Sequence, residues 1–531
     1  MEKALNMGKT SASGSFALLI GVAVSTVIMA VGTIILGRLL TPDEYGLYGI
    51  VLIPATMMNL FRDWGMNSAI TKYIASLRAS HREEEIHDFI VAGLIFEVAS
   101  GLALSFLSLF LANFIASTVF HRPESAYFIA IMSISIVSGS LLTASQSVFI
   151  GFERMGLNSF TLICQAIVKT AIAPVLVFVG YDVLGAVIGS TLSFLAAGII
   201  GLVTFYLVLF RPLRKKRTGN SNIKKALKTM LSYGVPLSVA SILGGILAQV
   251  YAFMMPSFAD NTMIGNYQTA ANFTVLLTFF TIPIATVLFP AFAKLDPKNE
   301  RELVKRVFAS SVKYTSILLV PATMVLMALS GPMISTLYGE KYVYGPFFLT
   351  IAVIGNLFAI AGSLSQNSFL SGLGETKMLM KQSIITIIIG LPLGLLLIPP
   401  LGITGLIIAN VFAGVPSLFW ILYWIWKHYN AKADFHSSAK ILAASTIAAF
   451  TAYLPTILLQ TVNWIKLVIG LIVFLTVYVL DAPIIGAVSQ ADINTLKTMF
   501  SGLGFISKLI NIPLIITEKI AKSVFGSKEQ S

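Results

Sequence analysis

Long apolar stretches alternate with short polar turns along almost the whole chain. A helix needs roughly 20 apolar residues to cross a hydrocarbon core about 30 Å thick, and the chain offers this length repeatedly. Turns rich in Gly, Pro, Asn and Asp join the stretches. We predict fourteen membrane-spanning helices, at residues 14–37, 46–66, 87–113, 126–150, 157–180, 183–210, 230–256, 263–290, 310–337, 345–371, 378–399, 402–426, 438–459 and 464–487.

Strands of a membrane β-barrel would be half as long and would alternate apolar with polar residues, so the pattern favours helices. The first apolar stretch is too long for the apolar region of a signal peptide and has no small-residue cleavage site after it. We therefore expect it to remain as the first spanning helix.

A repeat of about 220 residues runs through the chain. The stretch SQSVF begins at Ser145 and SQNSF begins at Ser365, which is 220 positions later. Two pairs of glycines keep nearly the same spacing, Gly185 with Gly405 and Gly46 with Gly265. The repeat is much longer than a solenoid unit and is long enough to be half of a large domain.

Six helices fall in each repeat, and an even number inserts both copies in the same orientation. The predicted fold is an all-α integral membrane protein with two six-helix lobes, related by a parallel repeat, and two further C-terminal helices. The expected divisions are an N-lobe, a cytoplasmic basic linker, a C-lobe, helices 13 and 14, and a cytoplasmic amphipathic tail, at residues 1–211, 212–229, 230–427, 428–488 and 489–531.

Composition and charge agree with a bilayer location. Charged residues make up 11% of the chain, and the mean hydropathy is +0.86; an ordinary soluble domain has about 25% charged residues. The net charge of +13 would suggest nucleic acid in a soluble protein, but its placement follows topology. All but five of the 36 Lys and Arg residues lie at the ends of the chain or near loops after even-numbered helices.

Because positive charge marks the cytoplasmic side, we expect both termini in the cytoplasm and a multi-pass protein of the plasma or inner membrane. The largest basic cluster, at residues 211–228, then contacts anionic lipid. The single cysteine, Cys164, lies inside a predicted span and excludes a disulfide framework.

Several stretches resemble the polysaccharide biosynthesis and O-antigen flippase family. They are GRLLTPDEYGLYGI at 37–50, FRDWGMNSAITKYIA at 61–75, LYGEKYVYGPFFLTIAVIGNLF at 337–358 and SFLSGLGETK at 368–377. The family belongs to the multidrug, oligosaccharidyl-lipid and polysaccharide exporter superfamily, and the resemblance covers nearly the whole chain. It implies two six-helix lobes and transport of a lipid-linked oligosaccharide or polysaccharide precursor by alternating access. The implied partners are a polyprenyl diphosphate oligosaccharide and membrane lipids, with no nucleic acid and no cofactor, and the transporter acts as a monomer beside glycan-assembly proteins.

Charges inside spans are costly and are usually functional, and here they gather in the first repeat. Arg62 and Asp63 lie on the second helix, Glu97 on the third and Lys169 on the fifth, whereas the central parts of helices 7 to 12 carry none. Glu97 and Lys169 lie at similar depth, so we expect that they can meet.

Arg62 and Lys169 are candidate cationic contacts for a diphosphate, because fork and point-charge donors both suit phosphate. Neutral candidates for diphosphate or sugar contacts are Asn59 and Gln165 beside these cations, and Gln366 and Asn272 in the second repeat, where Gln249, Gln268, Asn356 and Asn367 also lie. Asp63 and Glu97 are candidate ion-coupling carboxylates, because a buried carboxylate can bind a proton or sodium.

Structural explanations stay open for each charge. Glu97 and Lys169 could form an ion pair that only locks two helices together. Arg62 lies near the cytoplasmic end of its helix and could extend to water. Helix packing explains any single amide equally well.

Other functions are weaker on the sequence. A membrane glycosyltransferase, polymerase or ligase needs catalytic residues on a sizeable outer loop, whereas these loops are short and carry no nucleophile, metal or phosphate-loop motif; we therefore expect no enzyme. An ion-coupled multidrug or cation antiporter and a non-transporting scaffold remain as alternatives. The stretch from Asp492 onward has amphipathic spacing and is expected along the inner membrane surface.

Overall fold

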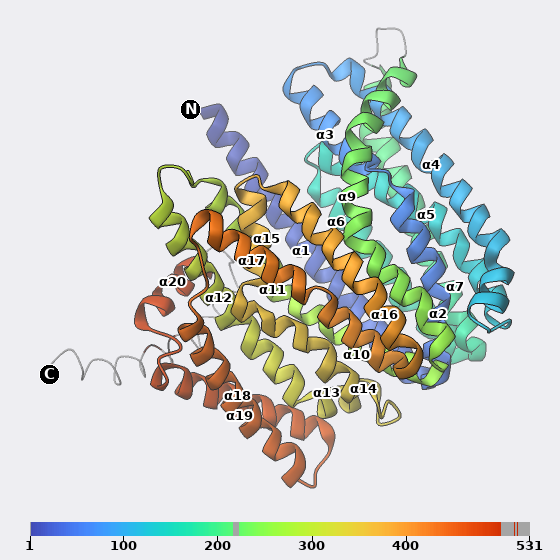
Figure 1. The fold of residues 1–531 in the computed structure, drawn as a ribbon. Coiled ribbons are helices and arrows are strands. Elements are labelled where there is room, and N and C mark those ends of the chain that lie inside the picture. Colours follow the sequence, from blue (N-terminus) through green and yellow to red (C-terminus); the bar gives the residue numbers. More distant parts are fainter. Residues whose placement is uncertain (1, 216–221, 501–514, 516–517, 519–531) are drawn as a thin grey trace. The chain divides into compact units, whose positions relative to one another are not determined.

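The computed structural model describes residues 2–215, 222–500, 515 and 518. All regular structure in these residues is helical (Figure 1). The elements are α1 Glu2–Leu39, α2 Pro42–Arg62, α3 Met66–Ala79, α4 Glu83–Phe114, η1 Ile115–Val119, α5 Ser125–Gly151, α6 Met155–Leu176, η2 Val177–Tyr181, α7 Asp182–Phe205, η3 Tyr206–Phe210, α8 Arg211–Lys215, α9 Ile223–Phe258, α10 Asn261–Thr274, η4 Val275–Leu277, α11 Thr278–Ala293, α12 Arg301–Ala328, α13 Ser330–Tyr338, α14 Gly345–Val353, η5 Ile354–Ala361, α15 Ser363–Gly372, α16 Thr376–Ala413, α17 Val415–Tyr429, α18 Phe435–Leu458, α19 Asn463–Ile484 and α20 Gln490–Phe500.

The chain forms two compact units, residues 1–265 and 266–531. In the first unit α4, α5, α6 and α7 pack in a bundle, α1 lies along α6, and α9 contacts α2, α3 and α4. Small residues allow the close approach, since a Cβ on Gly189 would lie 2.4 Å from the Cβ of Ala173. Packing thus groups α9 with the first unit, while the repeat assigns it to the second lobe. The predicted lobe boundaries stay a prediction.

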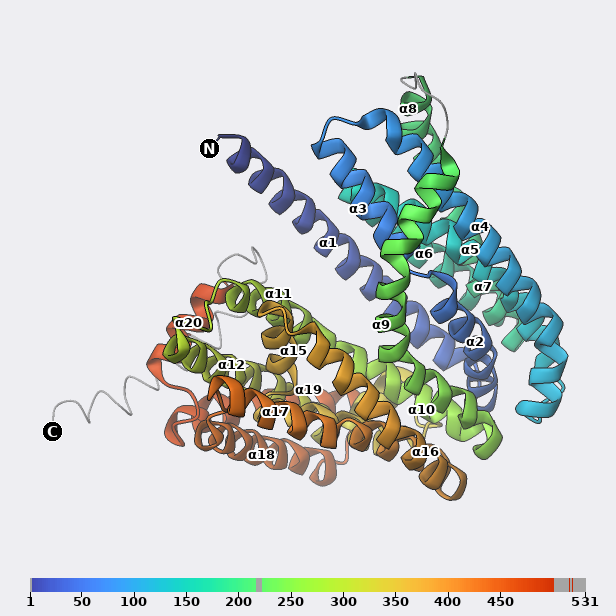
Figure 2. The ribbon, with the colours of Figure 1, turned by 45° about the horizontal axis from the view of Figure 1, so that its top comes forward.

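The second unit is arranged around α12, which contacts α18, α19 and η5. Helices α18 and α19 run side by side at the end of the chain (Figures 1 and 2). The ring of Phe369 meets those of Phe292 and Phe308 edge to face, with centroids 5.2 Å apart in both pairs. The amphipathic stretch begins as α20, whose Ile493 is buried; beyond residue 500 the predicted tail lies outside the described residues, except for 515 and 518.

Nine helical stretches of the described chain are long and apolar enough to cross a membrane, and a pair bent by 55°, Gly345–Ala361 with Ser363–Gly372, would make ten. Two of the nine, Met155–Leu213 and Thr376–Tyr429, each hold two of the predicted spans. Helix α2 and the interrupted run from α10 to α11 are not among them. The protein is therefore a multi-pass helical membrane protein, while the count of fourteen stays a prediction.

The same sharp turn occurs once in each repeat. Asp182 has φ 40° and ψ −126°, and Gly402, which lies 220 positions later, has φ 54° and ψ −126°. Three residues after each turn a glycine lies against the preceding helix: a Cβ on Gly185 would be 2.8 Å from the carbonyl carbon of Leu176, and one on Gly405 would be 2.0 Å from the carbonyl oxygen of Leu397. The repeat seen in the sequence is thus a repeat of backbone geometry.

Candidate functional site: a buried arginine and glutamate network

The site begins where α2 ends. Thr41 and Glu44 fix the start of α2 through a reciprocal capping box. At its other end the chain turns sharply, because Trp64 has φ 48° and Gly65 has φ 73°. Asp63 accepts a hydrogen bond from the backbone N–H of Asn67 at 2.9 Å and so satisfies one of the first N–H groups of α3, whose N-cap residue is Gly65. This break leaves Arg62 as the last residue of α2.

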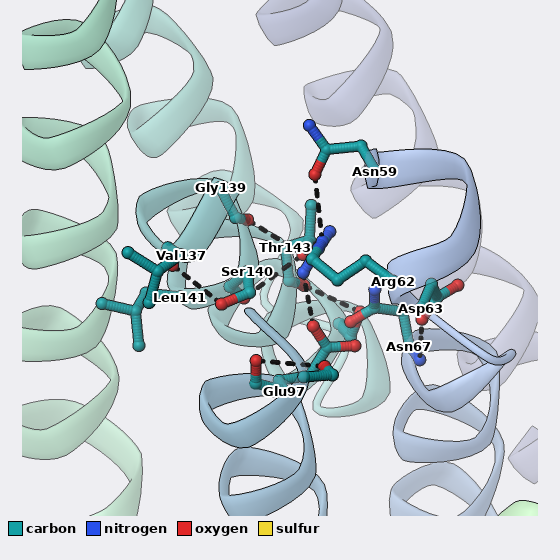
Figure 3. A network of polar contacts seen from close by, with 12 residues as sticks. Asn59, Arg62, Asp63, Asn67, Glu97, Val137, Gly139, Ser140, Leu141 and Thr143 are labelled. Carbon is teal, nitrogen blue, oxygen red and sulfur yellow. Dashed lines mark hydrogen bonds and ion pairs between the residues drawn. The ribbon is translucent and has the colours of Figure 1, made fainter. Parts of the chain in front are cut away.

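The guanidinium of Arg62 is buried and lies between three helices (Figure 3). One terminal nitrogen donates to Oε2 of Glu97 on α4 at 2.5 Å, and Nε donates to Oδ1 of Asn59 at 3.1 Å. The other terminal nitrogen donates to the hydroxyl of Thr143 on α5 at 3.0 Å. That hydroxyl in turn donates to the carbonyl oxygen of Gly139 at 3.0 Å. Three side chains therefore hold one cation in place inside an apolar bundle.

Glu97 is fully buried, with 0% of its surface exposed. Its Oε2 bonds Arg62, but its Oε1 has no hydrogen-bond partner among the residues that the structure describes. A buried carboxylate oxygen without a donor is costly. This oxygen is an available position for a proton, a cation or a donor group of a ligand.

The pairing corrects two sequence expectations. Glu97 meets Arg62 instead of Lys169, and Arg62 does not extend to water, since only 5% of its surface is exposed. Equal depth in the bilayer fixes height along a helix but not the direction in which a side chain points. Lys169 is half-buried on α6 and has no hydrogen-bond or ion-pair partner within the described residues.

The remaining candidates lie at several places. Gln165 is buried on the same helix as Lys169, one turn away. In the second unit Asn272 donates to the hydroxyl of Tyr338 at 3.1 Å. Gln366 is 3% exposed, and its Oε1 has no partner among the described residues. The structure thus brings together Asn59, Arg62, Asp63 and Glu97, and leaves Lys169 outside this network.

Sequence reasoning missed Thr143 and Arg122. Thr143 is a common residue in an apolar helix, so only the structure reveals its contact with Arg62. Arg122 is one of the few cations on the predicted outer side, which could have singled it out. It donates to Oδ1 of Asn261 at 2.6 Å and to the carbonyl oxygens of Pro256, Ala259 and Phe120, which ties the turn between α9 and α10 to the turn before α5. Burial lowers the pKa of Arg122 below its ordinary value, although neighbouring carboxylates oppose this change.

Taken together, the fold and the site define a multi-pass helical membrane protein with a buried ion pair. The chain belongs to the polysaccharide biosynthesis protein family, which it matches over residues 11–296.

Curated relatives include three that cover most of the chain. The probable low-salt glycan biosynthesis flippase Agl15 of Haloferax volcanii is 21% identical over 82% of this chain and 88% of that protein. The lipid II flippase MurJ of Bacillus subtilis is 20% identical over 94% and 96%. The uncharacterized membrane protein MJ1068 of Methanocaldococcus jannaschii is 23% identical over 72% and 76%.

Two solved structures share the fold. A lipid II flippase MurJ in an inward closed conformation has a TM-score of 0.69 and 17% identity, and the similarity covers 87% of this chain and 97% of that chain. An inward-facing multidrug resistance MATE family transporter has a TM-score of 0.61 and 14% identity, with 78% and 98% covered. At these identities the similarity establishes the fold.

Proposed function

We propose that this protein is a flippase that moves a lipid-linked oligosaccharide or polysaccharide precursor from the cytoplasmic to the outer leaflet. The observation that carries the proposal is the buried cation Arg62, held by Glu97, Asn59 and Thr143 in a chain of the polysaccharide biosynthesis protein family. The names of relatives that span most of the chain support it, since two of them are flippases. The protein performs transport and no bond-making chemistry in this proposal.

Arg62 is suited to a diphosphate because a guanidinium presents several N–H donors in one plane. A charge-assisted bond between such a donor and a phosphate oxygen is about twice as strong as a neutral one. The low dielectric of the surrounding helices strengthens it further. Asn59 and Thr143 keep the guanidinium oriented, so little rotational freedom is lost when the ligand binds.

Glu97 supplies the exchange step. Its carboxylate competes with phosphate for Arg62, so protonation of Glu97 would leave the cation free to bind the substrate. Oε1 of Glu97, which has no hydrogen-bond partner among the described residues, provides a place for this proton. Loss of the proton restores the ion pair and releases the phosphate, which couples transport to an ion gradient. Asp63 is the second candidate coupling carboxylate beside Arg62.

Lys169 is the second cation proposed for the diphosphate. The residue is half-buried and its ammonium lacks a partner within the described residues, so it is available to a ligand. Gln165 shares its helix face. The buried amide of Gln366 and the amide of Asn272 are neutral groups of the kind that sugar hydroxyls bond, and they permit varied glycans.

The setting of this activity is also proposed. The charge bias supports a location in the plasma or inner membrane with both termini in the cytoplasm. The lipid tail of the substrate stays in the bilayer while the glycan crosses, and the transporter works as a monomer beside glycan-assembly proteins.

The proposal is tested by transport of a polyprenyl diphosphate oligosaccharide in proteoliposomes. Lys169→Ala and Arg62→Lys should each lower the initial rate about tenfold or more, because each removes charge-assisted donors worth about 1.5–3 kcal/mol. Lys169→Arg should be milder. Arg306→Ala removes an exposed arginine on α12 and is the matched control, with a parental rate. If Lys169→Ala and Arg62→Lys insert normally and transport at the parental rate, the diphosphate site is not there.

The same vesicles test the antiporter alternative. A cationic dye should not cross at a rate that depends on Arg62 or Glu97. Ion-driven dye export together with no movement of the lipid-linked glycan would replace the flippase with a cation antiporter, and movement of neither would favour a scaffold.

A further inference from the structure

A second polar site lies between α3 and α9, which contact each other in the first unit (Figure 2). A cavity of about 500 Å³ opens between these helices and is lined by Tyr73, Lys228, Thr229, Ser232 and Tyr233. This volume falls within the range of small-molecule sites, roughly 300–1,000 Å³. None of the residues of the Arg62 network lines it.

The walls of the cavity are fixed by aromatic packing. The ring of Tyr73 stacks on Phe89 with centroids 5.0 Å apart and meets Tyr233 edge to face at 6.0 Å. The ammonium of Lys72 lies 3.5 Å from the centroid of the Tyr233 ring. Tyr73 and Tyr233 pack against the hydrophobic core cluster that contains the fully buried Met230. The cavity therefore has a formed shape before any ligand enters it.

The polar groups of the cavity are donors. Lys228 brings an ammonium, and the hydroxyls of Tyr73, Ser232 and Tyr233 have no hydrogen-bond partner among the described residues. No carboxylate lines the cavity. The nearby carboxylate of Asp88 accepts the backbone N–H of Asn222 at 2.7 Å, at the start of α9.

From this arrangement we propose that the cavity between α3 and α9 binds a phosphate group carried by a membrane lipid. The ammonium of Lys228, the ammonium of Lys72 over the Tyr233 ring, and three hydroxyl donors match the oxygens of a phosphate ester. Phosphate oxygens accept several hydrogen bonds and carry the negative charge that ammonium groups attract, whereas a neutral sugar lacks this charge and a cation is repelled by them.

The position of the cavity favours a lipid as the carrier of the phosphate. The cavity lies near the start of α9, and its Lys228 is the last residue of the basic stretch that the sequence shows at 211–228. The charge bias predicts this end of the helices at the cytoplasmic surface, where lipid phosphates are dense. A phospholipid headgroup and a polyprenyl diphosphate both present this chemistry. The site goes beyond the proposed transport path, since its occupation does not require transport.

Native mass spectrometry of the purified full chain tests the site, because it counts bound lipids and gives a dissociation constant for each. The probes are phosphatidylglycerol and farnesyl diphosphate, with diacylglycerol and farnesol, which carry no phosphate, as reference ligands. The double variant Lys72→Gln/Lys228→Gln should weaken the tightest binding step about tenfold or more. Lys224→Gln/Lys225→Gln removes the same two charges from exposed positions of α9 that do not line the cavity, and it should change binding less than about twofold.

If Lys72→Gln/Lys228→Gln loses affinity for farnesyl diphosphate alone, the ligand is an isoprenoid diphosphate. If it loses affinity equally for both probes, the site binds lipid phosphates in general. Tyr233→Phe, which keeps the ring and removes the hydroxyl, should lower the affinity of the same step. The proposal is overturned if Lys224→Gln/Lys225→Gln weakens binding as much as Lys72→Gln/Lys228→Gln, or if none of the variants changes it. Transport of glycan is measured separately, so failure of this site and failure of the flippase proposal are distinguishable.

Discussion

Gly46 of α2 and Gly265 of α10 lie against each other, although they are the equivalent residues of two repeats. A Cβ on Gly46 would lie 1.8 Å from the carbonyl oxygen of Asn261, and one on Gly265 would lie 2.0 Å from the carbonyl oxygen of Pro42. Pro42 and Asn261 are themselves equivalent, because both pairs are 219 positions apart. Each helix thus meets its counterpart through the same surface, as in a symmetric interface.

This contact predicts that alanine is not tolerated at either glycine. Backbone atoms occupy the space, so Gly46→Ala and Gly265→Ala should each lower the free energy of unfolding by about 1–3 kcal/mol. Thermal unfolding in detergent, read by intrinsic fluorescence, measures the change.

Gly244→Ala serves as the control. Gly244 lies in α9, and a Cβ there meets no atom within 4 Å. Alanine should leave stability unchanged or raise it by up to about 1 kcal/mol, because it favours the helix. Equal unfolding temperatures for all three variants would contradict the close crossing.

The ion pair between Arg62 and Glu97 predicts an asymmetry between single and double substitutions. Arg62→Met should destabilise the protein by about 3–5 kcal/mol, because it leaves a charged or protonated Glu97 buried without its partner. Arg62→Met/Glu97→Met should recover most of that stability, since an apolar pair of similar volume fits an apolar bundle. Both variants should fail in transport, which separates the functional role from the structural one.

An exposed ion pair gives the matched comparison. Lys305 bonds Glu302 at 2.5 Å on α12, with three quarters of the Glu302 side chain exposed. Lys305→Met should cost less than about 1 kcal/mol. If Arg62→Met/Glu97→Met is no more stable than Arg62→Met, the unpaired Glu97 is not the source of the lost stability.

The sequence was sufficient for a multi-pass helical membrane fold, the repeat and the burial of charge in the first repeat, because each depends on composition or spacing. It could not place Glu97 against Arg62 instead of Lys169, since the direction of a side chain depends on how α2, α4 and α6 rotate against one another. The break after Arg62 was also missed. Trp64 and Gly65 both have positive φ there, which ended α2 before the predicted boundary at residue 66.

Asp434 predicts a pH-dependent contribution to stability outside the spans. Bonds from the Ser437 hydroxyl and from the backbone N–H groups of His436 and Ser437 hold the pKa of Asp434 below its usual range, although partial burial opposes this. A lowered pKa means that the folded state favours the carboxylate. The stabilisation is therefore fully present above the ordinary aspartate pKa of about 4, and it is lost as pH falls through the lowered value.

Asp434→Ala should cost about 1 kcal/mol at neutral pH, because Asp434 caps the start of α18. The difference from the parent should shrink as pH falls below about 4. Asp434→Asn keeps an acceptor and should show a smaller loss with no such pH dependence. A constant difference between the Ala variant and the parent from pH 7 to pH 3 would exclude the carboxylate as the cause.

The repeated turn gives a prediction with opposite signs in the two repeats. Asp182 and Gly402 adopt nearly the same backbone angles, with positive φ, but only glycine adopts them without strain. Asp182 is exposed. Asp182→Gly should therefore raise stability by about 1 kcal/mol, since relief of roughly 1–3 kcal/mol of strain outweighs the entropy of an added glycine. Gly402→Ala should lower stability by a similar or larger amount.

Gly414→Ala is the control, because φ there is −84° and a Cβ meets no atom within 4 Å. The shared turn predicts the highest unfolding temperature for Asp182→Gly, intermediate values for the parent and Gly414→Ala, and the lowest value for Gly402→Ala. Destabilisation by Asp182→Gly would show instead that the aspartate side chain, and not the backbone angles, determines the turn in the first repeat.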